Sequence, residues 1–186
     1  HGVEQVALVQ MVDQVGNESG CIQSGLHLGC LYHRQCVPIL GVAINRSPDE
    51  LRQRIETDVA KASGMLGLDC KLAEQDIHIL AGYLGEGYAA PTPGAMNAIA
   101  LAARLEGILL DPCYTGKAMH AAIDVARRFG AGRNVVFIHT GGLPGIFSYP
   151  SESYLPADAA AAGDGTAAAF PAHPYLPGIS ARSPIP

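Results

Sequence analysis

Short apolar runs alternate with segments that carry helix-capping residues, and this alternation constrains the fold more than any other feature of the sequence. Residues 38–44 (PILGVAI), 77–80 (IHIL) and 135–138 (VVFI) are short and mostly apolar. Such runs are typical of strands covered on both faces of a parallel sheet. Because helical segments separate them, we predict an α/β fold with a mostly parallel sheet and helices on both faces.

The predicted helices begin at residues that favour helix starts. Residues 47–50 (SPDE) supply an N-cap, a first-turn proline and a capping-box acid, and Thr92-Pro93 supplies a second cap with a first-turn proline. A third helix is expected to start near Thr115, and Gly67 is expected to end the first. The side chains expected to face the core follow helical spacing: Leu51, Ile55, Val59, Ala62 and Leu66, then Met96, Ile99, Ala103 and Ile108, then Met119, Ala122, Ile123 and Ala126.

The composition changes near residue 150. Residues 151–186 contain ten Ala and six Pro, including the run 159–162 (AAAA). Small residues and prolines bury too little apolar surface to offset an ordering entropy of ~1 to 2 kcal/mol per residue. We therefore predict a folded part over 1–150 and an Ala/Pro-rich, disordered tail over 151–186, with a short docking segment near Phe170 or Tyr175 as the alternative.

Charge and cysteine spacing exclude several classes of function. The net charge of −5 gives no general attraction to nucleic acid or anionic lipid. No apolar run approaches the roughly 18 to 20 residues of a membrane-spanning helix, and the first residues lack the pattern of a secretory signal. The cysteines have no metal-site spacing, so we expect reduced, mostly buried thiols and no metal: Cys21, Cys30, Cys36, Cys70 and Cys113. We predict a cytoplasmic protein that binds a small ligand.

Ligands of parallel α/β sheets bind at the carboxyl ends of the strands, and three segments are predicted to lie there. Residues 18–26 (ESGCIQSGL) place two glycines around a polar turn whose backbone N–H groups suit a phosphate, the alternative being a plain glycine turn. Residues 82–91 (GYLGEGYAAP) form a loop that presents two phenols, or a mobile surface loop. In residues 111–117 (DPCYTGK), Thr115 is an N-cap and Lys117 a solvated first-turn residue in the simplest interpretation. The last predicted strand ends at residues 140–142 (TGG), which suit a close backbone approach to a ligand.

Other chemical motifs are missing from the sequence. It contains no His-x-x-x-His, no Gly-x-Ser-x-Gly and no carboxylate pair at a spacing that argues for acid–base work. No Gly-x-Gly-x-x-Gly follows a predicted strand, which disfavours a nucleotide-binding oxidoreductase.

Taken together, three segments resemble a known enzyme family. They are residues 83–88 (YLGEGY), 106–117 (EGILLDPCYTGK) and 137–144 (FIHTGGLP). This order of motifs is similar to the pyridoxal-phosphate enzymes of the D-cysteine desulfhydrase and 1-aminocyclopropane-1-carboxylate (ACC) deaminase family, which have a tryptophan-synthase-β-like fold. The likeness covers roughly residues 17–149 and implies that 1–150 are the C-terminal part of the cofactor-binding large domain of a homodimer.

The resemblance implies roles for individual residues. Tyr88 and Tyr114 match tyrosines around the substrate and are the predicted catalytic residues. The residue matching Thr140 would meet the pyridine nitrogen of pyridoxal 5'-phosphate, and a neutral hydroxyl there would leave that nitrogen unprotonated. The predicted cofactor-binding residues, which include a phosphate loop over 20–25, are Gly20, Cys21, Gln23, Ser24, Gly25, Thr115, Thr140 and Gly141.

The implied reaction is a β-elimination on a small amino acid. D-cysteine would give pyruvate, ammonia and sulfide, and Tyr88 or Tyr114 would hydrogen-bond to the substrate carboxylate or the departing sulfur. Thr115 and Thr140 resemble the desulfhydrase branch, because the deaminase branch has an acid at the position of Thr115. An ACC deaminase-like enzyme is the alternative.

Parts of the family pattern have no counterpart here. The family attaches its cofactor to a Schiff-base lysine in an Asn-Lys-x-Arg-Lys-Leu-Glu-like segment, and none of the lysines in this sequence matches it: Lys61, Lys71 and Lys117. Cys21 and Ile22 stand where the phosphate loop carries hydroxyl residues, and residues 6–12 (VALVQMV) match poorly the strand expected before that loop. The chain therefore resembles the C-terminal portion of a longer enzyme, or a non-catalytic remnant that acts as a binding or oligomerisation module.

Overall fold

The fold is built on four parallel strands. The computed structural model describes residues 5–10, 20–35, 37–130, 134–150 and 154. Its sheet has the order β3-β2-β1-β4, and all three strand pairs are parallel. The strands are β1 (Gln5–Gln10), β2 (Ile39–Val42), β3 (His78–Leu80) and β4 (Asn134–Ile138).

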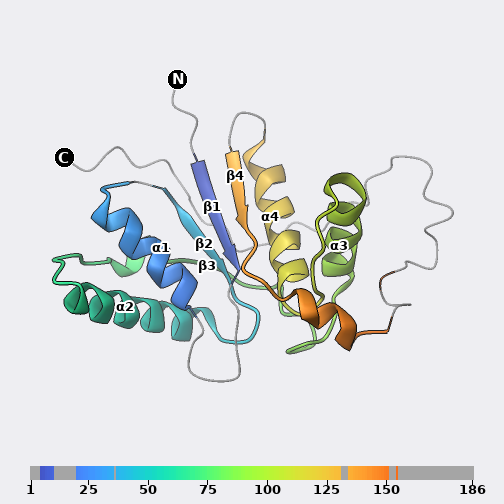
Figure 1. The fold of residues 1–186 in the computed structure, drawn as a ribbon, viewed down its shortest axis with the longest axis horizontal. Helices are drawn as coiled ribbons and strands as arrows, with labels where there is room; N and C mark the ends of the chain where they lie inside the picture. Colours follow the sequence, from blue (N-terminus) through green and yellow to red (C-terminus); the bar gives the residue numbers. More distant parts are fainter. Residues whose placement is uncertain (1–4, 11–19, 36, 131–133, 151–153, 155–186) are drawn as a thin grey trace.

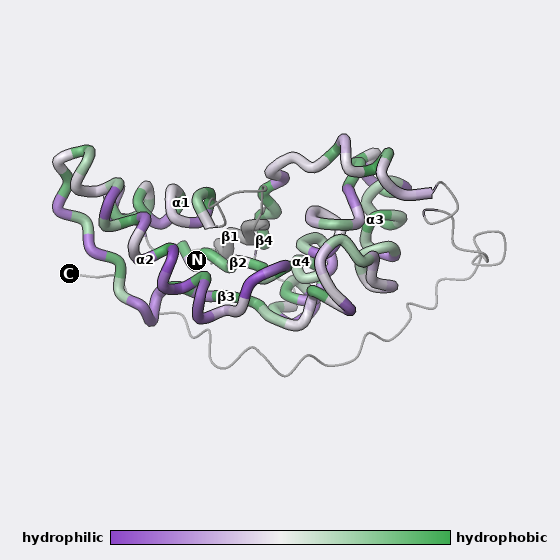
Figure 2. The backbone as a smooth tube through the Cα atoms, turned by 90° about the horizontal axis from the view of Figure 1, so that it is seen from below, coloured by the Kyte–Doolittle hydropathy of each residue, from purple (hydrophilic) through white to green (hydrophobic). Residues whose placement is uncertain are grey.

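Helices cover both faces of this sheet. Figures 1 and 2 show α1 (Cys21–Tyr32) and α2 (Pro48–Met65) on one side of the strands and α4 (Thr115–Phe129) on the other, with α3 (Pro93–Glu106) beyond α4. Two short 3-10 helices, η1 (Glu74–Asp76) and η2 (Leu143–Ser148), complete the described elements. The predicted α/β architecture, with a mostly parallel sheet and helices on both faces, is confirmed.

β1, which contains most of the segment that matches the family strand poorly, is an inner strand of the sheet. β1 pairs with β2 on one side, where Ala7 lies opposite Ile39, and with β4 on the other, where Val9 lies opposite Ile138. The poor match of residues 6–12 to the family strand therefore does not prevent strand formation, because an apolar run suffices for a strand with a neighbour on each side.

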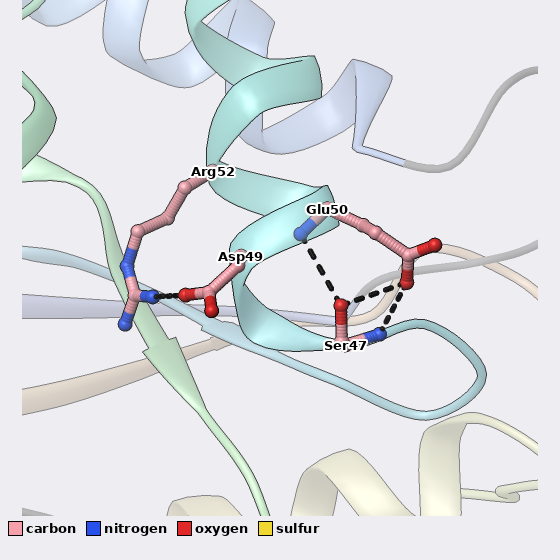
Figure 3. A network of polar contacts seen from close by, with 4 residues as sticks. All are labelled: Ser47, Asp49, Glu50 and Arg52. Carbon is pink, nitrogen blue, oxygen red and sulfur yellow. Dashed lines mark hydrogen bonds and ion pairs between the residues drawn. The ribbon is translucent and has the colours of Figure 1, made fainter.

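The start of α2 follows its sequence signals closely. Ser47 Oγ accepts a hydrogen bond from Glu50 N at 3.3 Å, and Glu50 Oε2 accepts one from Ser47 N at 2.9 Å. These two bonds form the predicted capping box, and Asp49 pairs with Arg52 at 2.6 Å on the same turn (Figure 3). Leu51, Ile55 and Val59 are buried as predicted.

The end of α2 differs from the predicted apolar stripe. Leu66 is exposed because the helix ends at Met65, and Gly67 then turns the chain with a φ of 66°. Ser63 is buried there instead; its hydroxyl donates to Leu68 O at 2.8 Å and accepts from Cys70 N at 3.0 Å. The polar side chain satisfies the backbone of the turn, which an apolar periodicity does not reveal.

The buried faces of α3 and α4 consist mostly of alanine. Of the residues predicted to face the core, Ile99 and Ala122 are buried, but Met96 and Met119 are only half-buried and Ala126 is exposed. Ile108 lies beyond α3, because Gly107 ends the helix with a φ of 67°. Small side chains let two helices approach closely, so the apolar residues at the contact are the small ones: Ala95, Ala98, Ala102, Ala118, Ala121 and Ala122.

β4 was predicted to be a buried strand and is not. Its five residues are either exposed or half-buried, and Val136 is 49% exposed. β4 lies at one edge of the described sheet, whereas β2 lies inside the sheet and all four of its residues are buried.

Most of the predicted tail lies outside the described residues, including Phe170 and Tyr175. Tyr154 is described, and its hydroxyl donates to Ile146 O at 2.8 Å while its ring packs beside Ile99 and Leu110. Cys36 also lies outside the described residues. Of the other four cysteines, Cys113 alone is buried, so the expectation of mostly buried thiols is wrong for these four.

Candidate active site

The predicted site segments meet at one edge of the sheet. Because the strands are parallel, their carboxyl ends share an edge, and α1 and α4 begin there (Figure 1). The chain leaves β1 through α1 towards β2, while β4 lies on the other side of β1. Such a reversal of strand order opens the crevice in which parallel sheets bind ligands.

The predicted phosphate loop is the start of a helix. Gly20 is the N-cap of α1 with a φ of 98°, and Ser24 N donates to Gly20 O at 2.9 Å, so Cys21, Gln23, Ser24 and Gly25 are already helical. The polar turn predicted over these residues is therefore wrong. A helix start nevertheless keeps the function of an anion site, because its first N–H groups point out of the helix end.

Two polar side chains at this helix start, Gln23 and Ser24, bond within the protein. Gln23 is fully buried, and its Nε2 donates to His78 O at 3.2 Å and lies 3.5 Å from His27 Nε2. A Cβ atom at Gly41 would overlap Gln23 Oε1, so only a glycine at that position of β2 leaves room for the amide. Ser24 Oγ donates to Gly20 O at 2.9 Å. Any anion at this helix start is therefore bound mainly by backbone N–H groups.

A buried carboxylate organises the start of α4. Asp111 is 0% exposed and accepts the backbone N–H groups of Cys113 at 2.9 Å, Tyr114 at 2.8 Å and Thr115 at 2.9 Å. Thr115 Oγ1 donates to Asp111 Oδ1 at 2.6 Å and accepts from Asp111 N at 2.7 Å. Thr115 is the first helical residue and Tyr114 the N-cap, so the interpretation of Thr115 as an N-cap is wrong. The hydroxyl of Thr115 is directed at Asp111.

Asp111 also joins this helix start to the end of β4. Gly142 has a φ of 85°, and a Cβ atom there would overlap Asp111 Oδ1. Sequence reasoning treated residues 111–112 as a turn and missed this role. The available signal was an aspartate four residues before a threonine at a predicted helix start, together with a glycine pair after a strand.

The two predicted catalytic tyrosines lie against each other. The hydroxyls of Tyr88 and Tyr114 form a hydrogen bond, and their rings meet edge to face at 5.9 Å between centroids. Burial raises the pKa of Tyr114 well above its ordinary value, and the bond to Tyr88 raises it further. Tyr88 is 52% exposed, so the pair is open to a ligand from one side.

The other phenol of the same loop points inwards, which corrects the prediction of two presented phenols. Tyr83 is buried, and its hydroxyl donates to Asp124 Oδ2 at 3.1 Å. Burial raises the pKa of Tyr83 strongly, with Asp124 adding to the shift. Tyr83 therefore ties the loop to α4, and Tyr88 alone of the two is available at the surface.

Lys117 is buried, so the interpretation as a solvated first-turn residue is wrong. It is 0% exposed, and its Nζ donates to Leu84 O at 2.7 Å and Gly87 O at 3.2 Å. Burial lowers the pKa of Lys117, and the neighbouring Cys113 and Asp111 oppose that shift. The ammonium group therefore holds the backbone of the loop that carries Tyr88.

The end of β4 offers room beside this arrangement. Gly141 has a φ of 119°, its N–H donates to His139 Nδ1 at 3.2 Å, and a Cβ atom there would meet nothing within 4 Å. Thr140 is half-buried. The predicted cofactor residues at this strand end thus border open space.

Comparison with known proteins shows the family to which the chain belongs. A family model described as "Pyridoxal-phosphate dependent enzyme" matches residues 4–141. The chain belongs to this family. Its fold and its cofactor class agree with those expected from residues 83–88, 106–117 and 137–144.

Two curated relatives and one solved structure define the likeness further. The D-cysteine desulfhydrases of Salmonella paratyphi C (strain RKS4594) and Salmonella typhi are each 38% identical over 148 residues, which are 78% of this chain and 44% of theirs. A crystal structure described as an ACC deaminase homologue superposes with a TM-score of 0.68 at 26% identity, covering 81% of this chain and 43% of its own. The chain spans less than half the length of the relatives that it matches.

The described residues fit the phosphate end of pyridoxal phosphate. The start of α1 supplies outward N–H groups for the phosphate, and the space at Gly141 leaves room for a ligand beside the strand ends.

The lysines do not fit a covalent link to the cofactor. Lys61 lies 13 residues beyond Pro48 at the carboxyl edge, which places it about 20 Å along α2 from the site. Lys71 lies between α2 and the start of β3, at the opposite edge. Lys117 is held by two carbonyl groups.

Two further features are absent from the described residues. No cluster of three or more histidine, cysteine, aspartate or glutamate side chains there is arranged for a metal ion. Nor does any helix among them combine the length and apolar character needed to cross a bilayer.

Proposed function

We propose that the chain forms part of a pyridoxal-phosphate dependent lyase that performs β-elimination on a small amino acid, in the manner of a D-cysteine desulfhydrase. The observation that carries this proposal is the Tyr88–Tyr114 hydroxyl pair, which lies at the same sheet edge as the start of α1. The 38% identity to D-cysteine desulfhydrases supports the choice of reaction. When bound, the cofactor supplies an electron sink that stabilises negative charge at the substrate α-carbon.

The start of α1 would hold the phosphate. Gly20, Cys21 and Gln23 contribute backbone N–H groups, while Ser24 and Gly25 belong to the same first turns. Because Cys21 and Ile22 are exposed and Ser24 bonds to Gly20 O, the hydroxyl donors of the family loop are replaced by peptide dipoles. This site would bind the phosphate through the partial positive charge and the alignment of the backbone N–H groups of α1, rather than through side-chain hydroxyls.

The tyrosine pair would stabilise negative charge on the leaving group or on the substrate carboxylate. The raised pKa of Tyr114 keeps its phenol protonated at neutral pH, so Tyr114 Oη is a hydrogen-bond donor. It would donate a hydrogen bond to the departing sulfur or to the substrate carboxylate, and Tyr88 Oη would donate one to Tyr114 Oη. Tyr88 reaches solvent, so water can bond to its hydroxyl in turn.

The two threonines support a desulfhydrase rather than a deaminase. Thr140 would present a neutral hydroxyl to the ring nitrogen. An acid at position 115, as in deaminases, would put a second carboxylate against the buried Asp111. The structural likeness to an ACC deaminase homologue supports the deaminase as the second candidate. The cytoplasmic location and the homodimer stay predictions.

A lysine from elsewhere would complete the enzyme. Since Lys61 and Lys71 lie away from the site and Lys117 holds a loop, we propose that the lysine linked to the cofactor belongs to a segment other than residues 1–186. If no such segment exists, the chain is a non-catalytic binding or oligomerisation module.

Co-expression with a matched fragment tests this function. The chain is produced together with a Salmonella D-cysteine desulfhydrase from which the 148 matched residues are deleted, and pyridoxal phosphate is added with either D-cysteine or ACC as substrate. We expect pyruvate and sulfide from the pair and from neither polypeptide alone, with borohydride fixing the cofactor to a lysine of the Salmonella fragment. A pair that binds the cofactor but gives ammonia only from ACC would establish the second candidate. Failure to fix the cofactor at all, under conditions where the intact relative does so, would support the non-catalytic alternative.

A further inference from the structure

The loop that carries Tyr88 is bonded on both sides of that residue. Lys117 Nζ donates to Gly87 O at 3.2 Å, just before Tyr88, and to Leu84 O at 2.7 Å. Tyr149 Oη donates to Ala89 O at 2.6 Å, just after Tyr88. The two donors come from different elements, since Lys117 lies in the first turn of α4 and Tyr149 follows η2.

The backbone between these two bonds is not in a relaxed conformation. Ala90 N donates to Gly87 O at 3.3 Å and closes a four-residue turn with Tyr88 and Ala89 at its centre. Ala89 has a φ of 60°, in the left-handed region that turns of this kind usually give to glycine. A non-glycine residue there costs about 1 to 3 kcal/mol and persists only where its surroundings impose it. The bond from Tyr149 falls on the carbonyl group of this strained residue.

The burial of Lys117 indicates a specific function for its charge. A buried ammonium group is unfavourable unless its hydrogen-bonding capacity is used. The two acceptors of Lys117, Leu84 O and Gly87 O, are carbonyl groups of the loop that carries Tyr88. A helix needs no such lysine for its own stability, so the contact serves the loop.

We propose that Lys117 and Tyr149 are positioning residues that clamp residues 84–90 and thereby hold the hydroxyl of Tyr88 against that of Tyr114. With both bonds present, the loop has one arrangement in which Tyr88 Oη meets Tyr114 Oη. With either bond lost, Ala89 relaxes towards ordinary backbone angles and carries Tyr88 away from its partner. The value of this clamp for catalysis rests on the proposed function, but the geometry that it imposes exists without cofactor or substrate.

The coupling between the two tyrosines is measured by fluorine NMR on the full chain labelled with 3-fluorotyrosine. The chain has seven tyrosines, and the variants Tyr88→Phe and Tyr114→Phe identify two of the resonances by their loss. The coupling is the displacement of the Tyr114 resonance that Tyr88→Phe causes. The same displacement is then measured by adding Tyr88→Phe to the Tyr149→Phe variant and to the Lys117→Met variant. We expect it to be smaller by roughly half or more in each of them.

Tyr154→Phe is the matched control. Tyr154 also donates a phenol hydroxyl to a backbone carbonyl at 2.8 Å, but this carbonyl belongs to Ile146 of η2 rather than to residues 84–90. The coupling should be unchanged in this variant. If Lys117→Met fails to fold, Tyr149→Phe decides the result alone.

Two results would overturn the clamp: full coupling in Tyr149→Phe, or an equal loss of coupling in Tyr154→Phe. Neither result touches the proposed lyase activity, which the co-expression experiment measures separately. A chain without activity would still give the coupling described here.

Discussion

Asp111 and Thr115 bond to each other three times at the start of α4. The carboxylate accepts the backbone N–H of Thr115 at 2.9 Å and its hydroxyl at 2.6 Å, and Thr115 Oγ1 accepts the N–H of Asp111 at 2.7 Å. Both residues are 0% exposed. This reciprocal arrangement fixes the peptide groups around Tyr114 and so connects the stability of the helix to the position of the tyrosine pair.

Asp111→Asn should be strongly destabilising. The amide retains one acceptor oxygen but turns the other acceptor into a donor that faces N–H groups, at an expected loss of about 2 to 4 kcal/mol. Urea unfolding followed by circular dichroism measures the change. Asp49→Asn is the control, because Asp49 is exposed beside Arg52 at the start of α2 and should lose under about 1 kcal/mol. Equal losses in the two variants would contradict the assigned role of Asp111.

His27 should make the chain less stable in acid. It is buried, and burial, with His78 adding to the effect, lowers its pKa to about 4 from an ordinary 6.5. The unfolded chain therefore binds more protons than the folded chain between these two values. Stability is fully present above pH 6.5 and falls as the pH drops towards 4, by at most about 3 kcal/mol.

The variant His27→Gln tests this pH dependence. It should remove the part of the slope between pH 6.5 and 4 that His27 causes, as seen in urea midpoints at several pH values. His33→Gln, at an exposed histidine near the end of α1, should leave the slope as it is. An unchanged slope in His27→Gln would assign the acid sensitivity to other groups.

Gly41→Ala should disturb the contact between β2 and α1. The new methyl group would overlap Gln23 Oε1 and push the amide away from His78 O, with an expected loss of about 1 to 3 kcal/mol. In the background Gln23→Ala the same change should be much milder, and a double-mutant cycle of unfolding free energies measures the difference. Gly64→Ala in α2 is the control: a Cβ atom there meets nothing, so it should stabilise by about 0.5 to 1 kcal/mol.

Local signals account for most of what the sequence predicted correctly. The capping box at Ser47 and the cap at Thr92 depend on residues three positions apart, and both are present in the structure. The strand at 39–42 follows from one apolar run that lies inside the sheet. Such features need no knowledge of the rest of the chain.

The features that the sequence did not predict depend on contacts between distant segments. Lys117 looks solvated in its own helix and is buried only because the loop 33 and 30 residues earlier brings two carbonyl groups to it. Tyr83 and Tyr88 look equivalent along the chain, yet Asp124 of α4 binds one of them inside. The family resemblance placed Tyr88 and Tyr114 around the substrate, but neither the resemblance nor any spacing predicted the hydrogen bond between their hydroxyls.

The absence of a hydroxyl at position 22 should limit phosphate binding, and a substitution can restore it. Ile22 lies in the first turn of α1 and is 40% exposed, so a threonine there is free to aim its hydroxyl at a phosphate beside the helix start. Ile22→Thr should tighten binding of pyridoxal phosphate to the chain about 5- to 10-fold, which corresponds to about 1 to 1.4 kcal/mol for one charge-assisted hydrogen bond. Equilibrium dialysis measures the affinity, with pyridoxal as the ligand that lacks the phosphate. Ile22→Val has the shape of the threonine variant without its hydroxyl and should bind like the unchanged chain. A gain shared by valine, or by pyridoxal, would place the phosphate somewhere other than the start of α1.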